Sequence, residues 1–206
     1  LARVEGGTFN PSETFTVTLS SFYISKYPVT QQDWIDVMGE WVFGFPNNPN
    51  HPAEQITWFN AIEFCNRLSV REGLTPCYGY TTNEEAYGTD IDDWPEGWDT
   101  DRNNHIFIQC NWETDGYRLP TEMEWEFAAR GGVPAQEAET FNTAYSGSDN
   151  IDDVAWYNMN SGGSTHPVGE KTPNELGLYD MSGNVWDWNW DIYGNYPTGS
   201  HPDPKG

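Results

Sequence analysis

Positively charged residues are scarce in this chain of 206 residues, which has 9 Lys and Arg against 32 Asp and Glu. The net charge of −23 at pH 7 repels a phosphate backbone, so we expect no nucleic-acid partner. Net charge affects solubility more directly than it indicates function, so we interpret the excess of acids first as a solvated acidic surface. Attraction of cations or basic ligands is the second interpretation.

Cysteine and long apolar runs are also rare. The three cysteines, Cys65, Cys77 and Cys110, include no pair separated by two residues, which excludes a zinc ribbon and a thioredoxin-type motif. A disulfide between Cys77 and Cys110 stays open as an alternative. No apolar run approaches the length of a transmembrane helix. The chain starts at Leu1 without a signal-peptide pattern, so we interpret it as a mature or trimmed fragment.

Large aromatic residues are abundant by contrast. They make up 16% of the chain, with 11 Trp, although the mean hydropathy is only −0.73. Burial must therefore come from scattered rings rather than from aliphatic runs. The 20 Gly and 14 Pro indicate a loop-rich chain, but one so rich in aromatics is not disordered. At this length we expect one domain, residues 1–206, with a substantial core.

Hydrophobic periodicity and capping residues predict an irregular α+β domain. Strands are predicted at 15–19, 22–24 and 106–112, and helices at 31–38, 58–72 and 122–130. Thr57 and Thr121 are the predicted N-caps of the second and third helices. Thr121 forms a capping box with Glu124, and Gly131 ends that helix. Residues 133–165 are predicted to be loop, and no βαβ alternation indicates a doubly wound sheet.

An acidic stretch, residues 83–104, is predicted to be a loop insertion. It contains eight acids and no base up to Asp101. The spacing of Asp99, Asp101 and Asn103 is like the start of an EF-hand loop. The sixth position of such a loop is Gly and here is Asn104, so we expect no calcium at this stretch.

The most informative segment is residues 177–190, which read GLYDMSGNVWDWNW. Its three Trp residues alternate, so an extended strand places them on one apolar face. They are Trp186, Trp188 and Trp190. Just before them, Asp180 and a turn at 182–184 supply a carboxylate and exposed backbone carbonyls. The pattern predicts a structural strand that anchors the core, next to a loop that holds a hard cation.

Four segments in order carry a family resemblance. They are FYISKYPVTQQDW at 22–34, ITWFNAIEFCNRLS at 56–69, GYRLPTEMEWEFAARGG at 116–132 and THPVGEKTPNELGLYDMSGNVWDW at 165–188. Together they resemble the formylglycine-generating-enzyme, or sulfatase-modifying-factor, domain family over nearly the whole chain. The resemblance implies a C-type lectin-like fold of the formylglycine-generating-enzyme type. That fold has a small antiparallel sheet, two main helices and extensive ordered loops.

The resemblance also implies a structural calcium ion in the loop before the tryptophan segment. Its expected ligands are the side chains of Asp180 and Asp187 and the main-chain oxygens of Gly183 and Val185. Calcium takes six to eight oxygen ligands and tolerates irregular geometry, so the residue types agree. The alternative is that Asp180 only caps the turn. Asp187 would then form an ion pair with Arg118 or Arg130.

Catalytic members of the family use a pair of copper-binding cysteines in their final segment. None of the three cysteines here matches that pair, and Cys65 lies on the apolar face of a predicted helix. No histidine lies near Cys77 or Cys110 in the sequence to activate a thiolate. Relatives continue beyond the position of Gly206, so we expect the C-terminal strands of the family to be missing from this sequence.

These points favour a non-catalytic ligand-binding display protein, like the variable proteins of diversity-generating retroelements in this family. Most of the binding face is expected in the missing C-terminal part, with Tyr193 and Tyr196 at its border; ordinary loop packing is the alternative for both. The ligand is expected to be a protein or another macromolecule rather than a sugar. The resemblance implies a cell-surface or extracytoplasmic location, with a lipid anchor as one mode of attachment. The alternative function is a copper-dependent formylglycine-generating oxidase or a sulfoxide-synthase-like enzyme.

Overall fold

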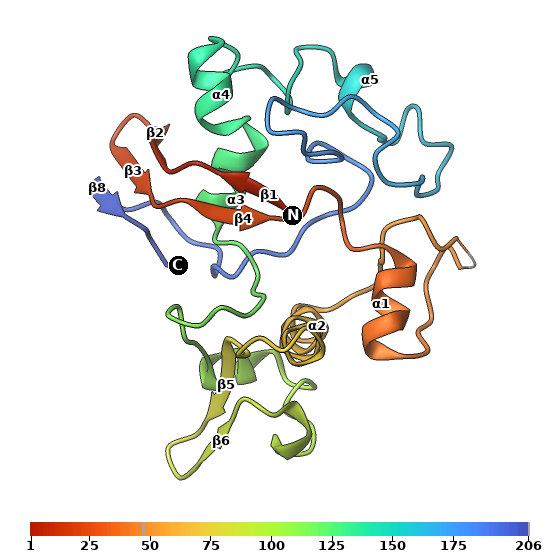
Figure 1. Cartoon of the computed structure of the whole chain (residues 1–206), viewed down its shortest axis with the longest axis vertical. Helices are drawn as coiled ribbons and strands as arrows, with labels where there is room; N and C mark the ends of the chain where they lie inside the picture. Colours follow the sequence, from red (N-terminus) through yellow and green to blue (C-terminus); the bar gives the residue numbers. More distant parts are fainter. Residues whose placement is uncertain (47, 206) are drawn as a thin grey trace. The chain divides into compact units, whose positions relative to one another are not determined.

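The computed structural model describes residues 1–46 and 48–205, and the chain divides into two compact units (Figure 1). Unit 1 consists of Leu1–Gln32, Phe43–Glu54 and Pro120–Gly206. Unit 2 consists of Asp33–Val42 and Gln55–Leu119. The sequence predicted one domain.

A long antiparallel hairpin opens unit 1. Its strands are β1 (Ala2–Val4), β2 (Gly7–Ser12), β3 (Phe15–Leu19) and β4 (Phe22–Ile24). β1 pairs with β4 and β2 pairs with β3, and β8 (Gly199–Pro202) lies beside β3 in parallel (Figure 1). The predicted bounds of β3 and β4 are confirmed. Alternate residues of β3 are buried, as a strand with one face on a core requires.

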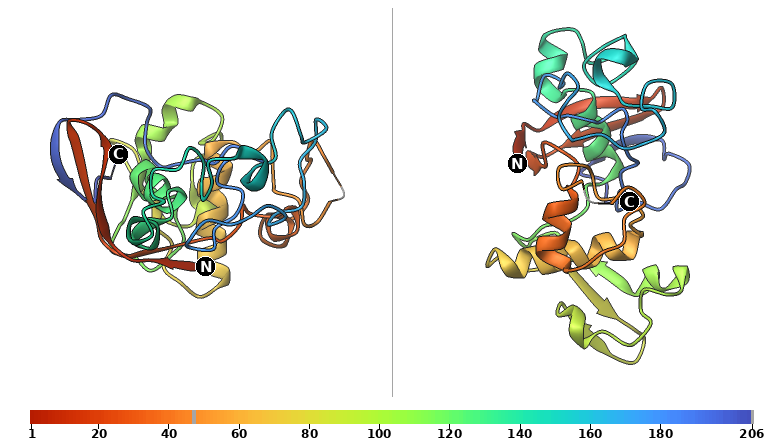
Figure 2. Two further views of the ribbon diagram at one scale, coloured as in Figure 1. Left: turned by 90° about the horizontal axis from the view of Figure 1, so that it is seen from above. Right: turned by 90° about the vertical axis from the view of Figure 1, so that its right-hand side faces the viewer.

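Helix α3 (Glu122–Ala129) packs on this hairpin and makes the core of unit 1. Met123 and Phe127 lie in one buried cluster with Val4, Val17 and residues of β2. The two views of Figure 2 show the hairpin and α3 side by side. The predicted capping box is confirmed: the Thr121 hydroxyl accepts from the Glu124 N–H at 3.2 Å.

Two short helices lie in the region predicted to be loop. They are α4 (Gly132–Glu137) and α5 (Ile151–Val154). The prediction of loop throughout 133–165 is therefore wrong. Gly131 ends α3 with a φ of +85°, and the chain then starts a second helix directly. Helices of one or two turns are too short to show a hydrophobic period, which is why the sequence did not reveal them.

The predicted helices of the N-terminal half are confirmed. They are α1 (Gln31–Met38) and, in unit 2, α2 (Trp58–Arg71). Thr57 caps α2 with a capping box formed with Asn60. The buried face of α2 includes Ile62 and Cys65, and the apolar face predicted for Cys65 is confirmed.

A three-stranded sheet completes unit 2. Its strands are β5 (Tyr78–Thr81), β6 (Ala86–Gly88) and β7 (Ile108–Cys110), in the order β6-β5-β7. The strand predicted at 106–112 is shorter because residues Arg102–Phe107 form a 3-10 helix, η2. The acidic stretch 83–104 is not simply a solvated loop: besides β6 it carries the 3-10 helix η1 (Ile91–Asp93), and Trp94 and Trp98 are buried. Trp98 packs edge-on against Phe59 of α2 at 5.8 Å.

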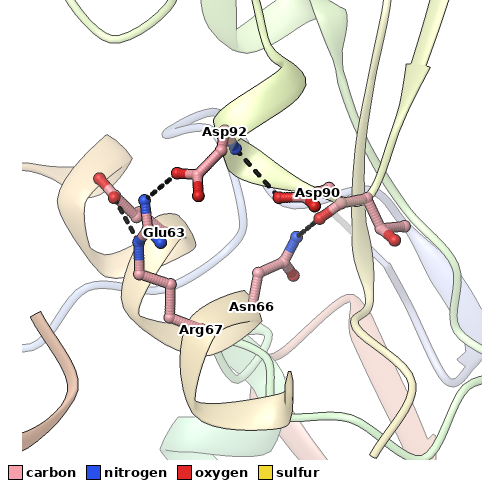
Figure 3. Close-up of polar contacts among 6 residues, drawn as sticks. Glu63, Asn66, Arg67, Asp90 and Asp92 are labelled. Atoms are coloured by element: carbon pink, nitrogen blue, oxygen red, sulfur yellow. Dashed lines mark hydrogen bonds and ion pairs between the residues drawn. The ribbon is translucent and has the colours of Figure 1, made fainter. Parts of the chain in front are cut away.

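Figure 3 shows how α2 holds the start of the acidic stretch. Arg67 lies between two carboxylates, 2.7 Å from Glu63 and 2.7 Å from Asp92. The buried Asn66 amide donates to the carbonyls of Tyr78, at 2.7 Å, and Thr89, at 3.0 Å. One polar face of α2 therefore fixes both β5 and the turn into η1.

The three cysteines are free, so the disulfide left open by the sequence is not formed. Tyr78 is the register partner of Cys110 in the sheet. Because side chains alternate along a strand, Cys77 lies on the opposite side from Cys110, which explains why the two do not pair. Among the described residues, no helix is both long and apolar enough to cross a membrane.

Candidate functional site

The turn before the tryptophan segment is held by buried hydrogen bonds. Asp180, only 3% exposed, adopts a φ of +60°, and its Oδ2 accepts from the Gly169 N–H at 2.8 Å. A Cβ on Gly183 would lie 2.4 Å from the Trp156 carbonyl oxygen, so only glycine allows this approach. The turn is therefore a close-packed structure and not an open loop.

Asn184 joins this turn to two other loops. Its backbone N–H donates to the Trp156 carbonyl at 2.8 Å, and its side-chain amide exchanges two 3.0 Å hydrogen bonds with the His166 backbone. The His166 ring stacks on Trp156 at 3.8 Å, and Lys171 Nζ lies 4.1 Å from the same indole. These contacts give the site a rigid wall.

Asp187 lies at the mouth of the site and accepts from Trp125 Nε1 at 3.1 Å. The residue reaches solvent, yet protein surrounds its carboxyl group, and this burial raises its pKa to about 6. The Trp125 hydrogen bond opposes the rise, and the charge of Asp180 adds to it. The alternative ion pair with Arg130 is wrong, because Arg130 pairs with Glu126 at 2.7 Å. The alternative ion pair with Arg118 stays a prediction.

The four expected calcium ligands lie along this one stretch of chain, and all of them offer oxygen. Asp180 is already used in the turn, and the Gly183 carbonyl accepts from the Val185 N–H at 2.9 Å. A carbonyl and a carboxylate each keep further lone pairs after one such bond, so the donor set suits a hard cation. No group of three or more His, Cys, Asp and Glu side chains placed to hold a metal occurs in the described part of the chain.

The tryptophan segment itself differs from its prediction. Residues 186–190 form no strand, Trp186 is 100% exposed and Trp188 is 49% exposed, so they do not anchor the core. The Trp190 N–H donates to the Pro120 carbonyl at 2.9 Å, which holds the segment near the start of α3. The alternation of the three Trp residues would place them on one face only if the segment were an extended strand. Burial of that face would also need a partner surface, and no described strand pairs with the segment.

The exposed tryptophan borders a hollow of about 530 Å³. Aromatic side chains and the backbone of the turn line most of it; they include Trp125, Trp156, Tyr157, Met181, Gly183, Trp186 and Asp187. A second hollow of about 390 Å³ shares three lining residues with it, Trp125, Met181 and Ser182. No spacing in the sequence relates Trp125 and Trp156 to Trp186, so the sequence did not reveal them as lining residues.

Of the two tyrosines predicted at the binding border, Tyr193 is fully exposed. Tyr196 is partly packed: its ring lies 5.5 Å from that of Phe15, and its hydroxyl donates to Glu122 at 2.9 Å. Burial, followed by the hydrogen bond to Glu122 and the charge of that residue, raises the pKa of Tyr196. Tyr193 thus stands free, whereas Tyr196 serves largely as a packing residue.

The segment around Tyr193 is fastened at both ends. Asp191 accepts from the first N–H of α3, that of Glu122, at 2.6 Å. After Tyr196, β8 pairs with β3, and Asp203 accepts from the Ser20 N–H at 2.6 Å and from its hydroxyl at 2.8 Å. The result is a short exposed loop between fixed ends.

Comparison with known proteins gives concordant matches. The profile of the family described as Sulfatase-modifying factor enzyme 1-like domain matches residues 2–203. Chaperone protein LppX of Paenibacillus barcinonensis is 42% identical over 98% of this chain and 73% of that protein. The formylglycine-generating enzyme of Mycobacterium tuberculosis is 28% identical over 90% of this chain and 69% of that protein. The structure of Treponema denticola variable protein 1 superposes with a TM-score of 0.81 at 32% identity, over 98% of this chain and 76% of that one.

Proposed function

Because the chain belongs to the sulfatase-modifying factor enzyme 1-like domain family, we propose that it is a non-catalytic member that binds a protein ligand. The matches confirm the family and the α+β, C-type lectin-like fold expected from the sequence. Fold alone does not determine function, so the proposal is argued from the surface and the thiols of this chain.

The observation that carries the proposal is the loop at Tyr193, exposed between fixed ends. A tyrosine on such a loop offers a large rigid contact surface that loses little entropy on binding. Fixed ends allow the loop to vary without loss of the fold. This is the arrangement that a display scaffold requires, and it supports Tyr193 over Tyr196 as a contact residue.

The relatives support a protein ligand. One is named a variable protein and another a chaperone protein, and a chaperone acts on other proteins. The acidic surface adds long-range attraction for a basic partner. We therefore propose a protein, rather than a sugar, as the ligand of this chain.

The cysteines do not favour the alternative, a copper-dependent oxidase. Burial raises the pKa of the Cys65 thiol to about 12, and it also raises that of Cys77. The thiolate is both the nucleophile and the metal ligand, so these two groups are suppressed at neutral pH. Cys110 faces the other side of the sheet from Cys77, and the three thiols do not form the pair that such an oxidase uses.

Site-specific photo-crosslinking tests the proposal. A benzophenone amino acid replaces Tyr193 in one variant and Met159 in the control, since Met159 is also a well-exposed apolar residue of unit 1. In cells that make the protein, we expect a discrete protein adduct at position 193 and none at 159. Identical adduct patterns at both positions would contradict a specific contact there.

An activity assay tests the alternative function. The full-length protein is purified from the producing cell and incubated with copper, oxygen and a cysteine-containing peptide, and the peptide is followed by mass spectrometry. We expect the cysteine to remain intact. Its conversion to formylglycine would overturn the non-catalytic proposal directly.

We further propose that the chain binds a structural calcium ion through Asp180, Gly183, Val185 and Asp187. Support comes from the all-oxygen donor set and from the two carboxylates, of which Asp180 disfavours the charge on Asp187. A divalent cation would relieve this repulsion and order the loop. We also propose an extracytoplasmic location with a lipid anchor, which radiolabelled palmitate incorporation in the producing cell would test.

A further inference from the structure

Four aromatic rings of unit 2 lie in series between its interior and its surface, and we call them the aromatic chain. They are Trp98, Trp94, Tyr80 and Tyr87. Successive ring centroids are 4.7, 5.4 and 5.8 Å apart, so neighbouring rings are in contact at each step. The first three rings are buried, and Phe59 of α2 packs on the inner end. Tyr87 of β6, at the outer end, is partly exposed.

All four rings belong to residue types that can give up one electron. Indole and phenol are the most easily oxidised aromatic side chains, whereas the phenylalanine ring is inert under the same conditions. Electron transfer between two rings falls off steeply with distance, so rings in contact exchange an electron fastest. The aromatic chain is therefore a continuous path along which an electron can pass from Tyr87 to the buried indoles.

The hydrogen bonds of these rings determine where the oxidised state comes to rest. Trp94 Nε1 donates to the Gly88 carbonyl at 3.1 Å, and a carbonyl is too weak a base to take the proton of an oxidised indole. Burial raises the pKa of Tyr80, so the interior does not favour loss of its proton either. The Tyr87 hydroxyl instead donates to the Glu85 carboxylate. A phenol whose proton has such an acceptor is easier to oxidise, which makes Tyr87 the end of the path.

The acidic stretch favours the positive charge that an oxidised indole carries. Residues 83–101 contain eight acids and no base, and all eight acids are exposed around the buried Trp94 and Trp98. Negative charges near a poorly hydrated interior lower the energy of a cation inside it. The backbone of Glu85 is also held in place, because its N–H donates to the Thr82 hydroxyl at 3.1 Å and its carbonyl accepts from the Thr82 N–H at 2.8 Å.

We propose that the aromatic chain carries oxidising equivalents from the interior of unit 2 to its surface. When a one-electron oxidant, such as an oxygen-centred radical, takes an electron from a buried indole, Tyr87 replaces that electron and passes its phenolic proton to Glu85. The products are the reduced oxidant, an intact indole, a neutral tyrosyl radical and a protonated Glu85. A soluble thiol then gives a hydrogen atom to the tyrosyl radical, and Glu85 releases its proton to water. This activity is separate from ligand binding and does not rest on the proposed function.

Ultraviolet irradiation of the whole chain tests the path. The light ionises buried and exposed indoles alike, and dissolved oxygen takes up the ejected electron. Peptide mapping by mass spectrometry then measures oxidation residue by residue. Trypsin releases the whole aromatic chain in one peptide, residues 72–102, and fragmentation of that peptide distinguishes its four rings.

Tyr87→Phe keeps the ring that packs on Tyr80 but removes the oxidisable phenol. We expect several-fold more oxidation at Trp94 and Trp98 in this variant than in the parent, because the electron that restores them is lost. Tyr80→Phe interrupts the path one ring earlier and should have the same effect. Tyr23→Phe, at an exposed tyrosine of unit 1, is the matched control and should leave both indoles as in the parent.

Equal oxidation of the two indoles in the parent, in Tyr87→Phe and in Tyr23→Phe would overturn the proposal. Because Tyr87→Phe changes only the hydroxyl of a partly exposed residue, it keeps the test decisive even if Tyr80→Phe does not fold. The adduct at position 193 and the formylglycine assay report on the proposed function alone, so the two proposals fail on different measurements.

Glu85→Gln tests the proton acceptor. Transient absorption after a laser pulse follows the tyrosyl radical, and the part of the signal that Tyr87→Phe lacks belongs to Tyr87. In the parent this part should form more slowly in D2O than in H2O, because a proton moves with the electron. We expect several-fold less of it in Glu85→Gln and the parent's yield in Glu84→Gln, which makes the same change at the adjacent exposed acid. Equal yields in the two variants would overturn the role of Glu85.

Discussion

Single polar side chains hold the loops of unit 1 in place. Asn174 is buried, and its amide nitrogen donates to the carbonyls of Ala128 and Ala129 at 2.8 and 3.2 Å. Its oxygen accepts from the N–H groups of Leu176 and Leu178. One residue thus provides hydrogen-bond donors for the last carbonyls of α3 and fixes the loop that leads to the candidate site.

Asn174→Ala should lower the free energy of unfolding by about 3 kcal/mol, because it leaves several buried backbone groups unsatisfied. Asn142→Ala is the control: Asn142 is exposed, and its bond to Arg130 should contribute less than about 0.5 kcal/mol. Urea unfolding measures both. Equal losses for the two variants would contradict a special role for Asn174.

The lowered pKa of His51 predicts that the stability of the fold depends on pH. Burial lowers its pKa below the ordinary value, and the neighbouring His166 lowers it further, although Glu170 opposes this. Below about pH 6.5 the unfolded chain therefore takes up a proton more readily than the folded chain, and stability falls as the pH falls. NMR titration should show a depressed pKa for His51 that rises in His166→Gln. An unchanged pKa in that variant would contradict the coupling.

The calcium proposal predicts opposite effects of Asp187→Asn with and without the ion. In millimolar calcium the parent should gain thermal stability that the variant lacks. In excess chelator at pH 7 the variant should be no less stable than the parent, because the fold disfavours the charged form of Asp187. Asp99→Asn, at an exposed acid, is the control. If neither calcium nor chelator changes the thermal midpoint of the parent, a structural calcium ion is ruled out.

At the scale of elements, α3 links the core to the candidate site. Its buried face, with Met123 and Phe127, packs on the N-terminal hairpin. Trp125 lines both hollows of the candidate site, and Glu122 lines the smaller one. The position of these walls therefore depends on how firmly the first turn of α3 is held.

Thr121→Ala should cost about 1 kcal/mol of stability, since it removes the hydroxyl that accepts from the Glu124 N–H. Thr121→Ser keeps that oxygen and should cost much less. Thermal unfolding compares the two variants, and hydrogen exchange of the first α3 amides should be faster only in the alanine variant. Similar exchange in both would show that packing, and not the cap, holds this turn.

At the scale of the whole molecule, the excess of acids dominates. With 32 acids and 9 bases, the folded chain repels itself and attracts basic partners from a distance. Both effects act through water between exposed charges, so salt screens both.

Raising NaCl from about 0.05 M to about 0.5 M should therefore raise the thermal midpoint of the chain, because salt screens the repulsion among its excess acids. Calorimetry measures this midpoint. A midpoint that stays unchanged or falls at high salt would contradict a destabilising self-repulsion.

The sequence by itself determined the local elements and the family. The bounds of α1, the N-cap at Thr57, the capping box at Thr121, and the strands at 15–19 and 22–24 follow from short-range periodicity and caps, which act within a few residues. The motif at 177–190 identified the scaffold for the same reason, since a close-packed turn constrains neighbouring residues.

Only the tertiary structure decided which of these residues meet. It left Trp186 and Trp188 exposed, where alternation had predicted burial, because no described strand covers their face. It also brought Trp125 and Trp156 to the same hollow from segments that the sequence separates. Burial and pocket formation depend on contacts between distant segments, and such contacts leave no period or spacing in a single sequence.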